Sequence, residues 1–390
     1  MENNAFGDLV RSYRRQRGWK QEELAKRWGF TREYVSQIER GKRKLEKNDQ
    51  VRRLADLLGI PQEQLEAIGK SIPVLQKPVE GNDRLLQALL EPAQNMIKMS
   101  WLIWQGDGGI IDLEASLYSL INELNQALEK YRGQFLAPAL RIQSYAYEML
   151  GKLSIERVQT QKAMGYFQEM YAIAEELNDA NLLALALVHQ AEMLRRSSRY
   201  HASMRRMEAV EKLIQQRGPE IENHVKGIFW KAYAINYFVM NDENNFSWTI
   251  DKALEISEDT RPSIASQVDE FDRVEILQTK AHGYTQLWKP QTALEIYKQT
   301  DKLRSFRPLR DQSSYHIIKA QAHCYAGDIK TGISHAMKGM EQAESFHSTR
   351  YVIRLQQMSD RLQPTLIGKE QAMQNLRREI QATLQRMKYW

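Results

Sequence analysis

Apolar residues recur every three or four positions along most of the chain, which is the spacing of one buried face of an α-helix. The first such segment runs from Phe6 to Tyr13 and ends at Gly18, a residue type that commonly follows the last turn of a helix. No long stretch alternates apolar and polar residues in the way typical of a β-strand. The pattern therefore predicts an all-α protein.

Further short helices follow within the first 68 residues. The second covers residues 21–28 and is broken by Gly29, and the third covers residues 32–40 with the Thr31 hydroxyl as its N-cap. A fourth helix is expected over residues 49–58, and Pro61 opens a fifth that reaches about residue 68. The tight glycine turn between the second and third helices indicates a helix-turn-helix, in which Val35 and Ile38 form the inward face of the third helix.

The order of residues in this head resembles a known family of DNA-binding domains. The matching segments are Gln21-Glu22-Glu23-Leu24-Ala25, Gly29-Phe30-Thr31, Val35-Ser36-Gln37-Ile38-Glu39-Arg40-Gly41-Lys42 and Leu54-Ala55-Asp56-Leu57-Leu58-Gly59. They are similar to the lambda-repressor/Cro type of helix-turn-helix found in bacterial regulators of the xenobiotic-response-element family, over residues 6–68 without an internal gap. In that family the third helix lies in the major groove. The resemblance therefore implies sequence-specific binding to duplex DNA.

The resemblance also implies which side chains contact DNA. Outward positions at the start of the third helix would face base edges, because Arg pairs with guanine, Gln with adenine, and Glu accepts from the cytosine amino group; these are Thr31, Arg32, Glu33, Ser36 and Gln37. The phosphate contacts implied by position are Gln21, Lys42, Arg43 and Lys44. Arg14 and Glu39 occupy positions that form a structural ion pair in relatives.

Charge is distributed unevenly along the chain. Residues 1–70 contain 16 Lys and Arg against 11 Asp and Glu, whereas the other 320 residues are almost neutral and the whole chain carries +6. A basic surface attracts the phosphate backbone because it releases condensed counterions. The charge pattern therefore favours DNA contact confined to the head.

The rest of the chain consists of repeated helix pairs. Residues 69–83 hold Gly and Pro with little periodicity and read as a linker between domains at 1–68 and 84–390. Beyond it, a small residue that marks the second helix of each pair recurs every 39 to 46 residues, at Ala163, Ser203, Thr249, Ala293 and Gly332. This pattern predicts an α-solenoid of tetratricopeptide-like helix pairs. One or two pairs are expected over residues 84–132, and a capping pair over residues 348–363 and 369–388.

A head of this type joined to such repeats resembles the bacterial quorum-sensing receptors of the Rap, Rgg, NprR, PlcR and PrgX group. The resemblance implies that the repeats bind a short signalling peptide, and we expect a homodimer that binds an inverted-repeat operator under control of that peptide. Placing the repeats in register puts a mixed charged and amide set on the concave first-helix face, which suits a peptide: Glu148, Lys152, Glu192, Arg195, Lys231, Gln278, His282 and Gln321.

Other classes of protein are less well supported. A tetratricopeptide adaptor that acts on a response regulator, or a phage or mobile-element regulator of the same build, remains an alternative. The sequence contains no GxxxxGK[ST], HExxH or GxSxG motif, so we expect neither an enzyme nor a metal or cofactor site. The single cysteine, Cys324, permits no internal disulfide and is expected to be buried. No apolar run could cross a bilayer and no signal peptide is apparent, which predicts a cytoplasmic protein.

Overall fold

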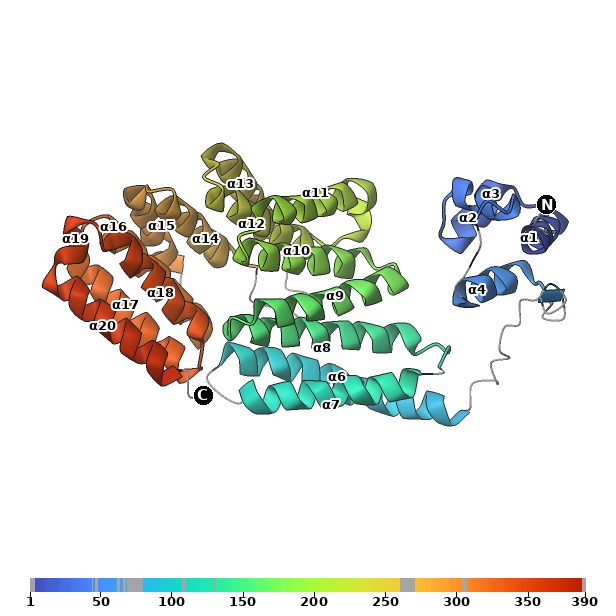
Figure 1. The fold of residues 1–390 in the computed structure, drawn as a ribbon, viewed down its shortest axis with the longest axis horizontal. Helices are drawn as coiled ribbons and strands as arrows, with labels where there is room; N and C mark the ends of the chain where they lie inside the picture. The colour runs from blue at the N-terminus through green and yellow to red at the C-terminus, as the bar shows by residue number, and fades with distance from the viewer. Residues whose placement is uncertain are drawn as a thin grey trace. The chain divides into compact units, whose positions relative to one another are not determined.

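The computed structural model describes residues 4–43, 45, 48–61, 64, 65, 68, 80–106, 110–129, 131–259, 271–303 and 307–387. Over these ranges the regular structure is helical, with no strand, so the prediction of an all-α chain is confirmed (Figure 1). The chain divides into two compact units, Met1–Lys77 and Pro78–Trp390. Each unit has its own buried apolar core.

The first unit consists of α1 (Ala5–Gln16), α2 (Gln21–Trp28), α3 (Arg32–Glu39) and α4 (Asn48–Leu58), drawn in blue in Figure 1. Gly18, Gly29 and Gly41 have φ values of 71°, 81° and 69°, which explains why glycine stands after each of the first three helices. Apolar side chains from all four helices meet in one core. Much of the expected fifth helix, like Lys44, lies outside the described residues.

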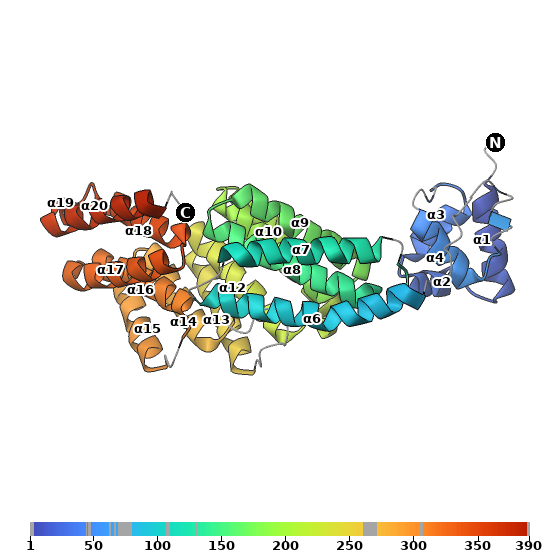
Figure 2. The ribbon, with the colours of Figure 1, turned by 90° about the horizontal axis from the view of Figure 1, so that it is seen from below.

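The second unit is built from successive antiparallel helix pairs (Figures 1 and 2). The helices are α6 (Glu80–Gln105), α7 (Ile110–Leu128), α8 (Leu136–Glu156), α9 (Thr160–Leu177), α10 (Ala180–Arg196), α11 (Tyr200–Arg217), the 3₁₀ turn η1 (Gly218–Glu220), α12 (Asn223–Val239), α13 (Glu243–Asp259), α14 (Arg273–Gln286), α15 (Pro290–Leu303), α16 (Leu309–Tyr325), α17 (Ile329–Ser345), α18 (Thr349–Leu362), α19 (Leu366–Lys369) and α20 (Gln371–Arg386). One pair, α6 and α7, precedes the repeats. The predicted capping pair corresponds to α18 and α20.

The small marker residues lie where the two helices of each pair approach one another. All five belong to the second helix of a pair and are buried, which confirms the predicted repeat. Gly151 of α8 shows why a small residue is needed, because a Cβ there would lie 2.4 Å from the ring of the buried Phe167 on α9. Large aromatic side chains thus fill the space that the small residues leave open.

The first helices of consecutive pairs form a continuous layer. Helix α10 packs against α12, α12 against α14, α14 against α16, and α16 against α18. The layer curves far enough that late helices meet early ones, since α16 also contacts α6 and α18 contacts α8. We call the side of this layer that is enclosed by the curvature the inner face.

The second unit begins a few residues earlier than the sequence predicts. Helix α6 begins at Glu80, inside the predicted linker, because glycine in a first helical turn is tolerated and Gly81 does not delay the helix. Residues 69–79 lie outside the described residues. Trp101 and Trp104 are core residues, and Cys324 is buried as predicted, which raises the pKa of its thiol to about 12. In the part of the chain that is described, no helix is both long and apolar enough to cross a bilayer.

Candidate nucleic-acid interface and ligand-binding face

Helix α3 presents a polar face outward and an apolar face inward. The Thr31 side chain accepts a hydrogen bond from the backbone N–H of Tyr34 at 3.2 Å, which confirms the predicted N-cap. Val35 and Ile38 are buried in the core of the first unit, where α3 packs against α1 and α2. Thr31, Arg32 and Glu33 are exposed at the start of the helix, where a helix-turn-helix contacts base edges.

A buried ion pair fixes α3 to the two helices before it. The Glu39 carboxylate accepts from Arg14 Nε at 2.5 Å and Nη2 at 3.0 Å, as predicted. It also accepts from Gln21 Nε2 at 2.7 Å. Burial alone would raise the pKa of Glu39, but these hydrogen bonds and the nearby guanidinium charges lower it. Glu39 therefore orients the Gln21 amide at the start of α2.

Ser36, which the sequence predicts to face a base edge, is not directed outward. Ser36 is only 4% exposed, and its hydroxyl accepts a hydrogen bond from Arg40 Nη2 at 2.5 Å. The guanidinium one turn later covers the serine, which helical periodicity alone could not show. Gln37 is half-buried, so a base edge can reach only part of its side chain. Arg40 itself is exposed.

Aromatic side chains support the turn that carries the basic residues. The rings of Phe30 and Tyr34 stack with their centroids 4.7 Å apart. The Arg43 guanidinium lies 4.5 Å from the Tyr34 ring centroid, a cation–π contact that holds it beside α3. Lys42 is exposed. Lys42 and Arg43 thus lie directly after the recognition helix, where the sequence placed phosphate contacts.

Several body residues expected to contact a ligand are engaged within the fold. Glu148 is fully buried and contacts His189 Nε2 at 2.9 Å, so its expected place on the concave face is wrong. Lys231 forms an ion pair with Glu275 at 2.9 Å. Gln278 is buried 3.5 Å from an Asp311 oxygen. The buried Gln321 amide donates to the backbone carbonyl of Arg354 at 3.3 Å. These side chains link neighbouring helices.

The other four predicted ligand residues interact electrostatically with one another; they are Lys152, Glu192, Arg195 and His282. The Glu192 carboxylate accepts from Arg196 Nε at 2.8 Å and Nη2 at 2.6 Å. Although burial opposes it, the charges of Arg196, Arg195 and Lys152 hold the pKa of Glu192 well below its usual value. Burial, together with nearby arginines, keeps the pKa of His282 well below the ordinary histidine value, so this imidazole is neutral.

Sequence reasoning missed the arginines of α18 that complete this group. Arg350 contacts Glu156 of α8 at 3.4 Å, and Arg361 Nη1 donates to Gln286 of α14 at 2.7 Å. Arg354 lies between Arg350 and Arg361 in the sequence of α18. Their spacing of four and seven residues places all three on one helix face. The sequence shows this spacing, but its periodicity alone predicts only a capping helix. We call Glu192, Arg195, Arg196, Arg350, Arg354 and Arg361 the inner cluster.

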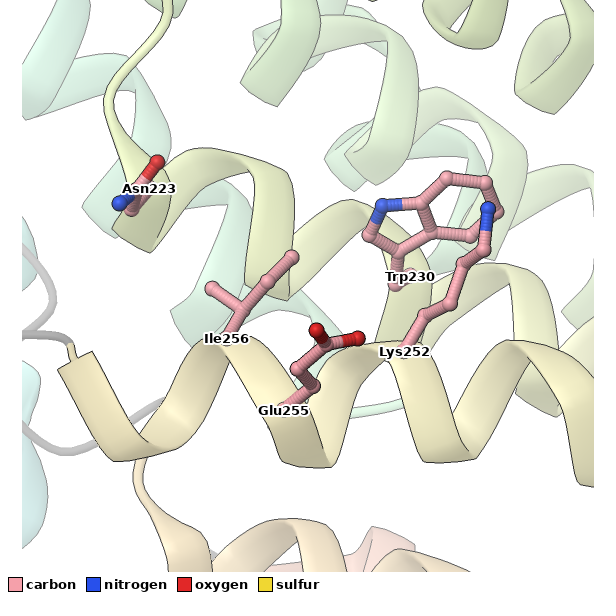
Figure 3. A pocket seen from close by; sticks show the side chains of 5 residues that line it. All are labelled: Asn223, Trp230, Lys252, Glu255 and Ile256. Atoms are coloured by element: carbon pink, nitrogen blue, oxygen red, sulfur yellow. The ribbon is translucent and has the colours of Figure 1, made fainter.

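A separate pocket of about 330 Å³ lies between α12 and α13 (Figure 3). Its lining residues are Asn223, Trp230, Lys252, Glu255 and Ile256, none of which the sequence singled out. Lys252 Nζ lies 4.5 Å from the Trp230 ring centroid and 3.9 Å from that of Trp248. Among the described residues, no group of three or more His, Cys, Asp or Glu side chains could hold a metal ion.

The geometry of the first unit defines a helix-turn-helix domain, followed in the chain by helical repeats. Residues 5–68 match the family model described as a helix-turn-helix domain. No curated protein matches the sequence. Among solved structures, the chain is similar to that of Bacillus thuringiensis PlcR in complex with the peptide PapR7 and DNA, with a TM-score of 0.37 and 12% identity over 84% of this chain and 99% of that chain.

Proposed function

We propose that this protein is a transcriptional regulator that binds specific sequences in duplex DNA through residues 1–68. The observation that carries the proposal is the form of α3, which is capped by Thr31, held by the Glu39 network and exposes Arg32 and Glu33 at its start. An exposed, rigidly supported N-terminal turn is what major-groove recognition requires. The family match over the same residues supports the same conclusion.

Selection of random duplex DNA with purified protein tests this proposal. The wild type is expected to select an inverted-repeat consensus. Arg32→Ala removes a bidentate base contact worth about 1–3 kcal/mol and relaxes the preference at one position of each half-site. Gln37→Ala should act at a neighbouring position. Arg205→Ala on α11, an exposed arginine outside the first unit, is the matched control. A wild type that selects no consensus would contradict DNA recognition and favour the adaptor alternative.

We further propose that residues 84–390 bind a short peptide and form the homodimer. The support is the curved layer of first helices with a charged inner face that remains partly open to solvent. Tetratricopeptide-like layers of this kind present extended concave surfaces. In a dimer, two copies of α3 would lie one DNA turn apart, about 34 Å, and a ligand that changes the curvature of the body would change that spacing.

Two measurements test the body's role. Light scattering of the full chain should give the mass of a dimer at the concentrations at which it binds DNA. The affinity for the selected operator should change when a peptide from a random library is bound. A monomer that binds a single half-site would contradict the dimer, and an affinity unaffected by every bound peptide would contradict the switch.

A further inference from the structure

The inner cluster contains more positive than negative charge. It contains five arginines from α10 and α18 and one carboxylate, Glu192, and the neighbouring carboxylate is Glu156 of α8, which contacts Arg350. Glu156 is also shared with a sixth arginine, since it lies 2.9 Å from Arg310 Nη1. One oxygen of the Glu192 carboxylate accepts both hydrogen bonds from Arg196. Each carboxylate is therefore already paired, Glu156 with Arg310 and Arg350 and Glu192 with Arg196.

Three of the arginines, Arg195, Arg354 and Arg361, form no ion pair with any carboxylate of the described residues, and of these Arg361 is held by the Gln286 side chain. Arg195 Nε is completely buried, and no hydrogen-bond acceptor in the described part of the chain reaches it. The side chains of Arg195 and Arg354 nevertheless keep some surface open to solvent. A buried guanidinium N–H without an acceptor is costly, and such groups mark places where a ligand completes the hydrogen bonding.

The surroundings make this arrangement unfavourable without an anion. Burial and the charges of Arg196 and Arg350, acting against Glu192, lower the pKa of Arg195 to about 10. Burial likewise lowers the pKa of Arg354 to about 10, and Arg350, Arg196 and Arg195 act in the same direction. Each of these two guanidinium groups thus lies within the electrostatic reach of the other. An added negative charge would offset the electrostatic repulsion on both guanidinium groups.

Contacts between helices hold the cluster in place. Arg350 contacts Glu156 of α8, and Arg361 donates a hydrogen bond to Gln286 of α14. The backbone carbonyl of Arg354 accepts a hydrogen bond from Gln321 of α16. A carboxylate accepts parallel N–H bonds from a planar guanidinium fork, so the chemistry of Arg195 and Arg354 suits a carboxylate ligand. His282 is neutral beside them and brings no competing positive charge.

We propose that Arg195 of α10 and Arg354 of α18 together bind a carboxylate of the peptide ligand, either an acidic side chain or the free C-terminus. This inference rests on the proposed peptide function and names the chemistry that the ligand must carry. Because the two arginines belong to early and late helix pairs, a carboxylate between them would draw these pairs together. Ligand charge would in this way set the curvature of the body.

Three libraries of short random peptides, presented to the full wild-type protein, provide the first test. The first has free C-termini, the second has amidated C-termini, and the third is amidated and lacks Asp and Glu. Retained peptides are identified by mass spectrometry. We expect retention from the first library, from the second only if a side-chain carboxylate is bound, and none from the third. Equal retention from the third library would overturn the inference, whereas no retention from any library would overturn the peptide function itself.

Variants provide the second test. A labelled peptide chosen by the wild type is measured by fluorescence anisotropy against Arg195→Gln, Arg354→Gln, Arg354→Lys and Arg205→Gln. Loss of a charge-assisted hydrogen bond should weaken binding about tenfold or more in the first two variants. Arg354→Lys should recover part of the affinity, and Arg205→Gln should leave it unchanged. Circular dichroism shows whether each variant is folded. Wild-type affinity in folded Arg195→Gln and Arg354→Gln would overturn the inference.

Discussion

Glu39 holds the first unit together, because one buried carboxylate joins α1, α2 and α3. Replacing Glu39 by Gln leaves the buried Arg14 without its counter-charge, at a cost of about 3 kcal/mol. We expect lower thermal stability of the helix-turn-helix and weaker operator binding. Hydrogen exchange of α1 to α3 and DNA titration measure the two effects.

The matched control for this variant is Glu22→Gln, because Glu22 is exposed on α2. The pH dependence gives a further check. Since the pKa of Glu39 is lowered in the folded protein, its contribution to stability is complete above the ordinary value of 4.5 and is lost as the pH falls below it. Equal exchange rates in Glu39→Gln and Glu22→Gln would show that the ion pair does not hold the domain together.

His335 of α17 is a second residue whose ionisation affects stability. Its Nδ1 lies 2.8 Å from His316 Nδ1, and its ring stacks on His323 with centroids 5.6 Å apart. Burial lowers the pKa of His335 to about 4, and the charges of Lys319, His323 and Lys338 act in the same direction, against Asp301. Protonation therefore favours the unfolded chain.

The body should accordingly lose stability as the pH falls from the ordinary histidine value of 6.5 towards 4, and keep it above 6.5. Urea midpoints at several pH values measure this loss. The difference between pH 7 and pH 5 should be smaller in His335→Gln than in the wild type. His201→Gln, at an exposed position on α11, should keep the wild-type difference. An unchanged difference in His335→Gln would show that this ring does not contribute.

At the scale of elements, the sequence predicts the structure correctly where the residues that determine it lie within one turn or one helix pair. Glycine at positive φ, the Thr31 cap and the small marker residues each act within one turn or one helix pair, and the structure places them as predicted. Errors occurred where a neighbouring side chain decides exposure, as when Arg40 covers Ser36. Periodicity assigns a face to a residue, but it does not show which long side chain lies over it.

Two glycines in one helix pair show how closely the elements pack. A Cβ at Gly151 would lie 2.4 Å from the Phe167 ring, whereas a Cβ at Gly165 on α9 would meet no atom within 4 Å. Gly151→Ala should destabilise the body by about 1–3 kcal/mol through overpacking. Gly165→Ala should stabilise it by about 1 kcal/mol, because alanine is the better helix former. Urea unfolding followed by helical circular dichroism measures both; the same sign for the two variants would contradict the packing argument.

At the scale of the whole molecule, the contacts that matter most could not be predicted from the sequence. Ser348 donates to Glu156 across 192 residues, and Arg310 donates to the Trp104 carbonyl across 206. No repeat pattern reports such pairs, since they depend on the accumulated curvature of all the intervening helix pairs. The arginines of α18 were interpreted as part of a cap for the same reason.

Glu156 joins the end of α8 to α16 and α18 through Arg310, Ser348 and Arg350. The charges of Arg350 and Arg310 keep its pKa low despite complete burial. Glu156→Gln removes the charge that both arginines share, and one of them, Arg310, is itself buried. Because α18 contacts α8 at this point, losing the charge should separate the late helix pairs from the early ones before the helices themselves unfold.

Hydrogen exchange should therefore become faster in α16 and α18 of Glu156→Gln while α10 to α13 keep their wild-type rates. Small-angle scattering of the same variant should give a larger radius of gyration. Glu169→Gln, at an exposed position on α9, is the control and should change neither measurement. If exchange instead rose evenly along all repeats, Glu156 would contribute only to general stability and the contact between early and late helices would not depend on it.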